Sequence, residues 1–182
     1  MCMFTFRVWA IACGRPNRPE ACMNQINRIQ WRFVSFCELT TQELYELLQL
    51  RSEVFVVEQA CAFQDLDGAD QMAMHLLGSA GGQLVAYARC FAAGDKFAEA
   101  SIGRVITRST LRGGGSGHLL MREAIENLEQ HWGAQPIRIG AQARLEKFYF
   151  QHGFLAAGVT YIEDGIDHIE MLRAWPAQPD LY

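Results

Sequence analysis

The sequence predicts a single α/β (α+β) domain, in which a mixed central sheet of about seven strands has helices on both faces. The chain has 182 residues, 50% of them hydrophobic, which is enough for one full core. Strand patterns outnumber helix patterns and are joined mostly by hairpin turns. One glycine-rich loop leads from a strand into a helix and on to another strand, which indicates a crossover between parallel strands of the same sheet.

We expect this domain to occupy residues 30–175. Residues 1–29 are interpreted as an N-terminal extension, because Pro16 and Pro19 interrupt regular structure and Met23 is an alternative start. The extension lacks the basic start and the small-residue cleavage site of a signal peptide. Deleting residues 1–22 is therefore expected to leave folding and activity intact. Residues 176–182 are expected to form an irregular tail.

Composition excludes several classes of partner. The net charge is −4 and the basic residues are dispersed, which argues against nucleic acid. The six cysteines contain no C-x-x-C pair, so neither a zinc site nor a disulfide framework is indicated, and a reducing cytoplasm fits best. No apolar run approaches the roughly 20 residues of a membrane span. We expect a cytoplasmic protein with no metal, membrane or nucleic-acid partner.

The first elements are a strand and a helix. Residues 30–38 alternate in a strand pattern and are expected to be buried on both faces. Thr40 and Glu43 have the spacing of a capping box, which predicts the start of a helix that continues to about Phe55. Arg51 lies on or beside the apolar stripe of this helix. It either extends to solvent from the edge of the stripe or belongs to the site.

An acidic segment follows the helix. Its four carboxylates have no basic residue among them: Glu58, Asp65, Asp67 and Asp70. Such an imbalance would attract a cation. The EF-hand pattern is not met, because Gly68 directly follows Asp67 and no glutamate closes the loop. Amine binding explains the segment better than calcium, and a solvated acidic loop is the structural alternative.

Residues 75–79 and 83–91 are expected to form a hairpin through Gly81 and Gly82. Arg89 lies among apolar residues of the second strand and needs a carboxylate, which Asp65 or Asp67 could supply. A histidine within a strand more often has a structural role than the role of a base, so the structural role is the first interpretation of His75.

A glycine cluster then follows the strand at residues 101–107. Residues 112–117 read Arg-Gly-Gly-Gly-Ser-Gly, and a helix begins near His118. Backbone amides at a helix N-terminus suit a phosphate group. The lysine of a Walker loop is missing after Gly117, and the third glycine of a Rossmann fingerprint is replaced by His118. Both of those nucleotide-binding motifs are therefore excluded.

The C-terminal part is predicted as a strand at residues 136–141, a helix at 142–152 that ends at Gly153, and strands at 154–162 and 166–173. The last two strands meet at Asp164-Gly165, a sequence typical of a type I′ hairpin.

Two motifs carry a resemblance to a known family. Residues 112–117 match the Arg/Gln-x-x-Gly-x-Gly/Ala signature of the GNAT acetyltransferases, and residues 148–154 look like their Phe-Tyr-x-x-x-Gly-Phe motif. Further segments are similar to the ElaA-like branch of this superfamily, including residues 50–59, 64–68, 102–105, 139–143 and 163–169. A fainter similarity to acyl-homoserine lactone synthases is carried by Arg51, Phe55, Asp65, Asp67, Asp70 and Arg89.

The GNAT resemblance implies an acetyl-CoA-dependent N-acetyltransferase, in which a primary amine attacks the thioester directly. It implies Tyr149 as the general acid. An amine that is protonated at neutral pH also needs a proton acceptor, and Glu58, at the end of the helix facing the acidic segment, is the first choice, with Asp65, Asp67, His75 and His168 open as alternative bases. The residues expected to bind the coenzyme are Val105, Ile106, Thr107, Arg112, Gly113, Gly114, Gly115, Ser116, Gly117 and Gln142, and an N–H near Val105 or Ile106 is expected to stabilise the oxyanion. The residues expected around the acceptor are Arg51, Asp65, Asp67, His75, Arg89, Arg104 and His168.

Two alternatives remain at this point. One is a GNAT module that binds acyl-CoA without turnover, and the other is an acyltransferase related to acyl-homoserine lactone synthases. The sequence does not choose among small-molecule and peptide amines as the acceptor. It also leaves the oligomeric state undecided, and a homodimer is allowed.

Overall fold

The structure is a computed structural model, and it describes residues 29–175. The predicted extension, apart from Ile29, lies outside the described residues, as do the tail at residues 176–182 and the expected dispensability of residues 1–22. Within residues 29–175, none of the helices has both the length and the apolar character required to cross a membrane.

Seven strands form one mixed sheet in the order β1-β2-β3-β4-β5-β7-β6. Only β4 and β5 pair in parallel, and every other neighbouring pair is antiparallel. The strands are β1 (Gln30–Ser35), β2 (Met74–Ala80), β3 (Gln83–Phe91), β4 (Ala100–Thr107), β5 (Ile137–Gln142), β6 (Leu155–Glu163) and β7 (Ile166–Arg173). The fold class predicted from sequence is confirmed.

Within the described residues, three α-helices accompany the sheet, namely α2 (Thr41–Arg51), α3 (Ser116–Trp132) and α4 (Glu146–Phe150). The predicted capping box begins α2: Glu43 N–H donates to the Thr40 hydroxyl at 3.2 Å, and Thr40 N–H donates to the Glu43 carboxylate at 2.9 Å. The predicted single helix differs in its second half, because the chain continues as a π-helical turn over Ser52–Glu58. The predicted helix at 142–152 is also shorter, with a 3₁₀ turn over Ala143–Leu145 before α4.

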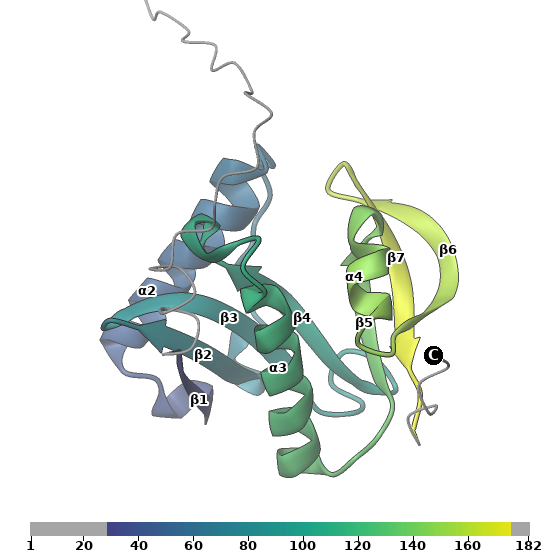
Figure 1. Cartoon of the computed structure of the whole chain (residues 1–182), viewed down its shortest axis with the longest axis horizontal. Coiled ribbons are helices and arrows are strands. Elements are labelled where there is room, and N and C mark those ends of the chain that lie inside the picture. Colours follow the sequence, from purple (N-terminus) through teal and green to yellow (C-terminus); the bar gives the residue numbers. More distant parts are fainter. Residues whose placement is uncertain (1–28, 176–182) are drawn as a thin grey trace, which may run out of the picture.

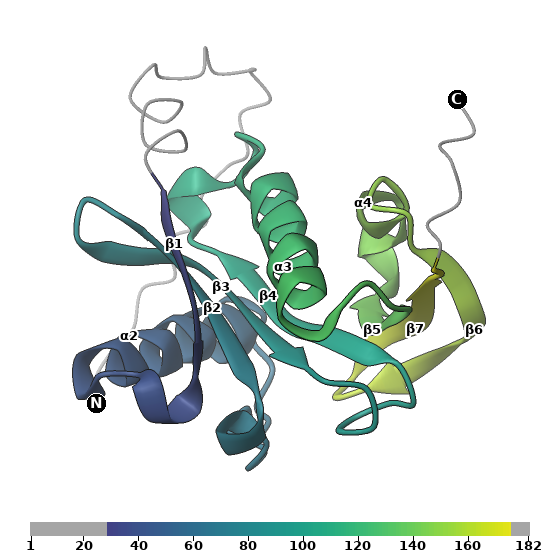
Figure 2. The ribbon, with the colours of Figure 1, turned by 90° about the horizontal axis from the view of Figure 1, so that it is seen from below.

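Two apolar cores lie on opposite faces of the sheet. Helix α2 covers one face, while α3 and α4 lie on the other (Figure 2). Neighbouring residues of β2 divide between them, since Leu76 packs in the core of α3 and Leu77 in the core of α2. This alternation is what a strand covered on both faces requires. It explains why β3 is buried along nearly its whole length.

The prediction for the first strand is wrong in two respects. Strand β1 ends at Ser35, and residues Phe36–Glu38 form a 3₁₀ turn. It also lies at the edge of the sheet, where Val34 is its one buried residue, so it is not buried on both faces. An alternating aromatic pattern cannot distinguish an edge strand from a central one, because the cover depends on elements elsewhere in the chain.

The sheet opens between β4 and β5. The two strands pair only at Ala100 and Ser101, and they diverge beyond this point. In Figure 1, β5, β7, β6 and α4 form one arm, and β1–β4 with α2 and α3 form the other. A bulge in β4 opposite β3 adds to the divergence, and Arg104 within it has a φ of 50°. The peptide groups of β4 after Ser101 therefore have no strand partner on the β5 side.

Candidate active site

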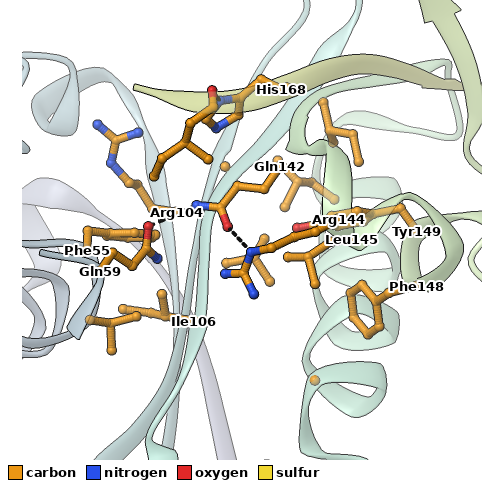
Figure 3. A pocket seen from close by; sticks show the side chains of 18 of the residues that line it. Phe55, Gln59, Arg104, Ile106, Gln142, Arg144, Leu145, Phe148, Tyr149 and His168 are labelled. Carbon is orange, nitrogen blue, oxygen red and sulfur yellow. Dashed lines mark hydrogen bonds between the residues drawn. The ribbon is translucent and has the colours of Figure 1, made fainter. Parts of the chain in front are cut away.

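A cavity of about 1220 Å³ lies in the opening between β4 and β5. Figure 3 shows Phe55, Gln59 and Arg104 on one side of it and Phe148 and Tyr149 on the other. Every residue predicted to bind the coenzyme lines this cavity: Val105, Ile106, Thr107, Arg112, Gly113, Gly114, Gly115, Ser116, Gly117 and Gln142. Phe148 and Tyr149 of the second motif line it as well, so both motifs contribute to one cavity.

The glycine loop has the backbone that a phosphate site requires. Gly113 has a φ of 76° and Gly115 a φ of 94°, in the left-handed region that favours glycine. Gly115 is the N-cap of α3, and the Ser116 hydroxyl donates to the carbonyl of Leu111 at 2.8 Å, which fixes the turn. The free amides and the positive end of a 17-residue helix therefore face the cavity.

Arg112 joins this loop to the end of the π-helical turn. Its Nε donates to the carbonyl of Thr107 at 3.0 Å, and its Nη1 donates to the carboxylate of Glu58 at 2.7 Å. Both side chains are partly exposed and line the cavity. The predicted phosphate ligand and the predicted base are thus an ion pair.

Tyr149 supplies a hydroxyl to the cavity wall. Its side chain is 8% exposed, and burial raises the pKa of Tyr149 to about 12. Among residues 29–175 its hydroxyl has no hydrogen-bond partner. The group is therefore a protonated donor that faces the cavity with its hydrogen-bonding capacity free.

A chain of polar side chains crosses the cavity at Gln142. Its amide nitrogen donates to the side-chain oxygen of Gln59 at 2.9 Å, while its own oxygen accepts from Arg144 Nε at 3.0 Å. Figure 3 places Gln142 between the two walls. The side chain is therefore reachable from the opening and already oriented by two partners.

The acidic segment is neutralised by arginines from other elements. Arg51 of α2 bridges Asp65 and Asp70, with N–O distances of 2.7 and 2.6 Å, and its side chain is fully buried. Arg89 of β3 pairs with Asp67 at 2.6 Å and with Asp70 at 2.8 Å. The excess of negative charge seen in the sequence is therefore balanced by arginines that the fold brings to this segment.

Arg104 completes this network of three arginines and three aspartates. Its Nε donates to the Asp65 carboxylate at 2.6 Å, and its guanidinium lies 5.7 and 5.9 Å from the ring centroids of Phe55 and Phe63. Hydrogen bonds from Arg89 are the largest cause of a pKa of Asp67 well below its usual range. One interpretation of the sequence had Arg51 extending to solvent, and this interpretation is wrong, because the side chain is fully buried.

The two histidines expected near the acceptor lie in different surroundings. His75 is buried between the Tyr87 hydroxyl, 2.8 Å from Nδ1, and the carbonyl of Asp70, 3.0 Å from Nε2, and desolvation lowers the pKa of His75. It does not line the cavity. His168 does line it, and its Nδ1 must donate to the carbonyl of Ile166 at 2.8 Å, which leaves Nε2 as the free acceptor of the neutral ring.

The structure therefore divides the predicted acceptor residues into two groups. Arg104 and His168 line the cavity together with Glu58 and Tyr149. Five others do not line the cavity, and all of them except the partly exposed Asp67 are buried: Arg51, Asp65, Asp67, His75 and Arg89. Among residues 29–175, no group of three or more His, Cys, Asp or Glu side chains is arranged to hold a metal ion.

Several cavity residues were not assigned to the site from the sequence. Phe63 and Lys96 come from loops, and Tyr161 and Glu163 from an exposed edge strand, although Glu163 belongs to a segment with the family resemblance. Each is an ordinary surface residue by local pattern, and tertiary structure alone brings it to the site. The turn at Asp164-Gly165 was the one available signal, since it places residues of β6 beside those of β7.

Comparison with known proteins agrees with this geometry. Residues 38–174 match the family described as acetyltransferase (GNAT) domain. Protein ElaA of Escherichia coli strain K12 is 45% identical over 147 residues, which cover 80% of this chain and 96% of that protein. A crystal structure of an acyl-CoA N-acyltransferase from Pseudomonas aeruginosa has a TM-score of 0.77 at 43% identity, over 80% of this chain and 99% of the other.

A more distant neighbour is the acyl-homoserine lactone synthase LasI, with a TM-score of 0.64 at 15% identity, over 79% of this chain and 88% of that one. At this identity the likeness shows a common fold alone.

Proposed function

Because the chain belongs to the GNAT acetyltransferase family, we propose that it moves an acetyl group from acetyl-CoA to a primary amine, by direct attack of the amine on the thioester. The observation that carries this proposal is the cavity between β4 and β5, which has a helix-capping glycine loop and an unpaired tyrosine hydroxyl in its lining. One cavity thus offers donors for a phosphate group and a donor for a leaving thiolate.

The coenzyme would be held mainly by backbone groups. The amides of Gly113 to Gly117 and the N-terminus of α3 suit the pyrophosphate, with Arg112 beside them. The unpaired edge of β4 at Val105, Ile106 and Thr107 offers peptide groups to the pantetheine amides, and the Gln142 amide can contact the same arm. An N–H of this edge, near Val105 or Ile106, is proposed to stabilise the oxyanion.

The acceptor ammonium loses two protons on becoming an amide: one passes to a base before the attack, and the other replaces the proton that Tyr149 gives to the sulfur. Tyr149, held in its protonated form, donates to the sulfur that leaves. The amine must lose a proton, because an amine of pKa about 10 is almost fully protonated at pH 7. Glu58 is our first choice to accept it, and His168 Nε2 is the other acceptor in the cavity. Asp65 and Asp67 are engaged by arginines.

The test measures thiol release from acetyl-CoA against a panel of primary amines, with acetyl-CoA binding followed separately by calorimetry. Tyr149→Phe should lower turnover by about 100-fold or more, the usual contribution of a general acid, while acetyl-CoA affinity stays close to that of the unchanged protein. Tyr45→Phe is the matched control, because Tyr45 is exposed and remote from the cavity.

Unchanged turnover in Tyr149→Phe would remove the role assigned to Tyr149. Binding of acetyl-CoA without thiol release for any amine would instead support a binding module and overturn the proposed activity.

A further inference from the structure

The side of the cavity lined by Arg104 has a donor that no other residue of 29–175 uses. Arg104 gives its Nε to Asp65, and its Nη2 lies 3.3 Å from the Asp65 carbonyl and 3.5 Å from the Asp67 carboxylate. Its Nη1 has no hydrogen-bond partner among residues 29–175. Because Phe55 and Phe63 lie against the guanidinium and Asp65 fixes its Nε, the free nitrogen is held in place at the cavity wall.

Lys96, an exposed residue, adds a second positive charge to the lining of the same cavity. It lines the cavity from the loop before β4, and its ammonium lies 5.8 Å from the centroid of the Phe97 ring. No carboxylate of residues 29–175 is within ion-pair distance of it. Desolvation, followed by the positive charges of Arg104 and Arg89, lowers the pKa of Lys96. An anion between Lys96 and Arg104 would relieve this repulsion.

Negative charge lies close by on the opposite arm. Glu163, at the end of β6, lines the cavity and is near enough to act electrostatically on Lys96 in the favourable sense. It has no ion-pair partner among the described residues, whereas Glu170 of the same arm is paired with Arg138 at 2.9 Å. This part of the cavity therefore presents unpaired groups of both signs.

We infer that the acceptor is an aminocarboxylate, an amine that also carries a carboxylate, and that Arg104 Nη1 and Lys96 bind this carboxylate while the amine lies toward Glu163 and the thioester. A cavity of both signs complements a zwitterion, whereas a diamine would leave Lys96 and Arg104 opposed by like charge. Asp65 positions Arg104, which gives the buried network behind the cavity a role in acceptor binding. The inference rests on the proposed acetyl transfer.

The test uses the full chain and acceptors that differ only in the carboxylate. The sets are leucine, leucinamide and isoamylamine; phenylalanine, phenylalaninamide and phenethylamine; and lysine, lysinamide and cadaverine. Thiol release from acetyl-CoA gives kcat/KM for each. The acid should exceed its amide and its decarboxylated amine by roughly 10- to 100-fold, the range expected for one charge-assisted contact. Within each acid–amide pair amine basicity works against this order, because an α-amine beside an amide has a pKa of only about 8 and is more often unprotonated, so the acid–amide ratio is the decisive one.

Lys96→Gln should reduce the ratio of acid to decarboxylated amine by about tenfold. Lys147→Gln is the matched control, since Lys147 is exposed and outside the cavity, and it should keep the ratio. Equal rates within each set, or a preference for cadaverine, would overturn the inference and leave the acetyl transfer standing. Failure of every amine to release thiol while acetyl-CoA still binds would overturn both.

Discussion

The glycine loop at residues 112–117 and the acidic segment at residues 58–70 reach the same cavity by opposite means. The loop makes its site from its own backbone, since Gly113, Gly115 and the start of α3 provide the amides. The acidic segment provides side-chain charges, and three arginines from α2, β3 and β4 engage them. A backbone site can therefore be interpreted locally, whereas a charged site depends on what the fold brings to it.

Breaking the arginine network around the acidic segment should lower the free energy of unfolding more than breaking the ion pair of the glycine loop. Arg51→Met leaves Asp65 and Asp70 without the guanidinium that joins them, and removing one partner of a buried pair typically costs about 3–5 kcal/mol. Because Arg104 and Arg89 remain beside these aspartates, we expect about 3 kcal/mol less free energy of unfolding in urea. Arg112→Met breaks a partly exposed pair and should cost less than about 1 kcal/mol. Equal losses of unfolding free energy in Arg51→Met and Arg112→Met would contradict the greater structural importance of the buried network.

The loop should be sensitive in binding rather than in folding. Gly115→Asp puts a side chain at a φ of 94° and a negative charge where a phosphate is expected, and acetyl-CoA binding measured by calorimetry should weaken by about tenfold or more, that is about 1.4 kcal/mol. Gly133→Asp is the control, because Gly133 also has a positive φ, 81°, and lies outside the cavity. Native-like affinity in Gly115→Asp would mean that the phosphates bind elsewhere.

The contrast between local and long-range features also explains which parts of the structure could be predicted from the sequence. The capping box at Thr40, the type I′ turn at Asp164-Gly165 and the glycines of residues 112–117 are local, because each depends on the φ preferences or hydrogen bonds of a few adjacent residues. All three are present in the structure. The opening between β4 and β5 has no local signature in the sequence, and the structure shows it as pairing that stops at Ser101.

The parts that sequence could not supply are long-range. Nothing near Asp65 in the chain shows that Arg51 and Arg104 flank it, so its carboxylate looked available for an amine. For the same reason, no local pattern predicted that Lys96 lines the cavity. The edge position of β1 is decided by which strand pairs with β2, a choice that the residues of β1 do not encode.

Lowering the pH should distinguish the ion-paired carboxylate of Asp67 from an unpaired one by its effect on the free energy of unfolding. Because the folded-state pKa of Asp67 is depressed, its stabilising contribution is complete above the unfolded pKa of about 3.9 and is lost as the pH falls toward the folded value. The gap in free energy of unfolding between the unchanged protein and Asp67→Asn should therefore be constant from pH 7 down to about pH 5, and should shrink progressively as the pH falls below about 4. Urea unfolding at a series of pH values measures it. Asp95→Asn, a change at an exposed residue outside every described ion pair, should give no such gap, and a pH-independent gap for Asp67→Asn would refute the assignment.

The smallest effect is expected where the two regions meet, at the pair of Glu58 and Arg112. Glu58→Gln should change the free energy of unfolding by less than about 1 kcal/mol, because both side chains are partly exposed. It also releases Arg112 from its carboxylate, so acetyl-CoA should bind a few-fold more tightly even as the proposed loss of the base slows turnover. Glu53→Gln breaks the comparable pair with Arg108, at 3.0 Å and outside the cavity, and should leave the affinity unchanged. If Glu58→Gln weakened acetyl-CoA binding instead, the carboxylate would be holding Arg112 in place for the phosphates rather than competing with them.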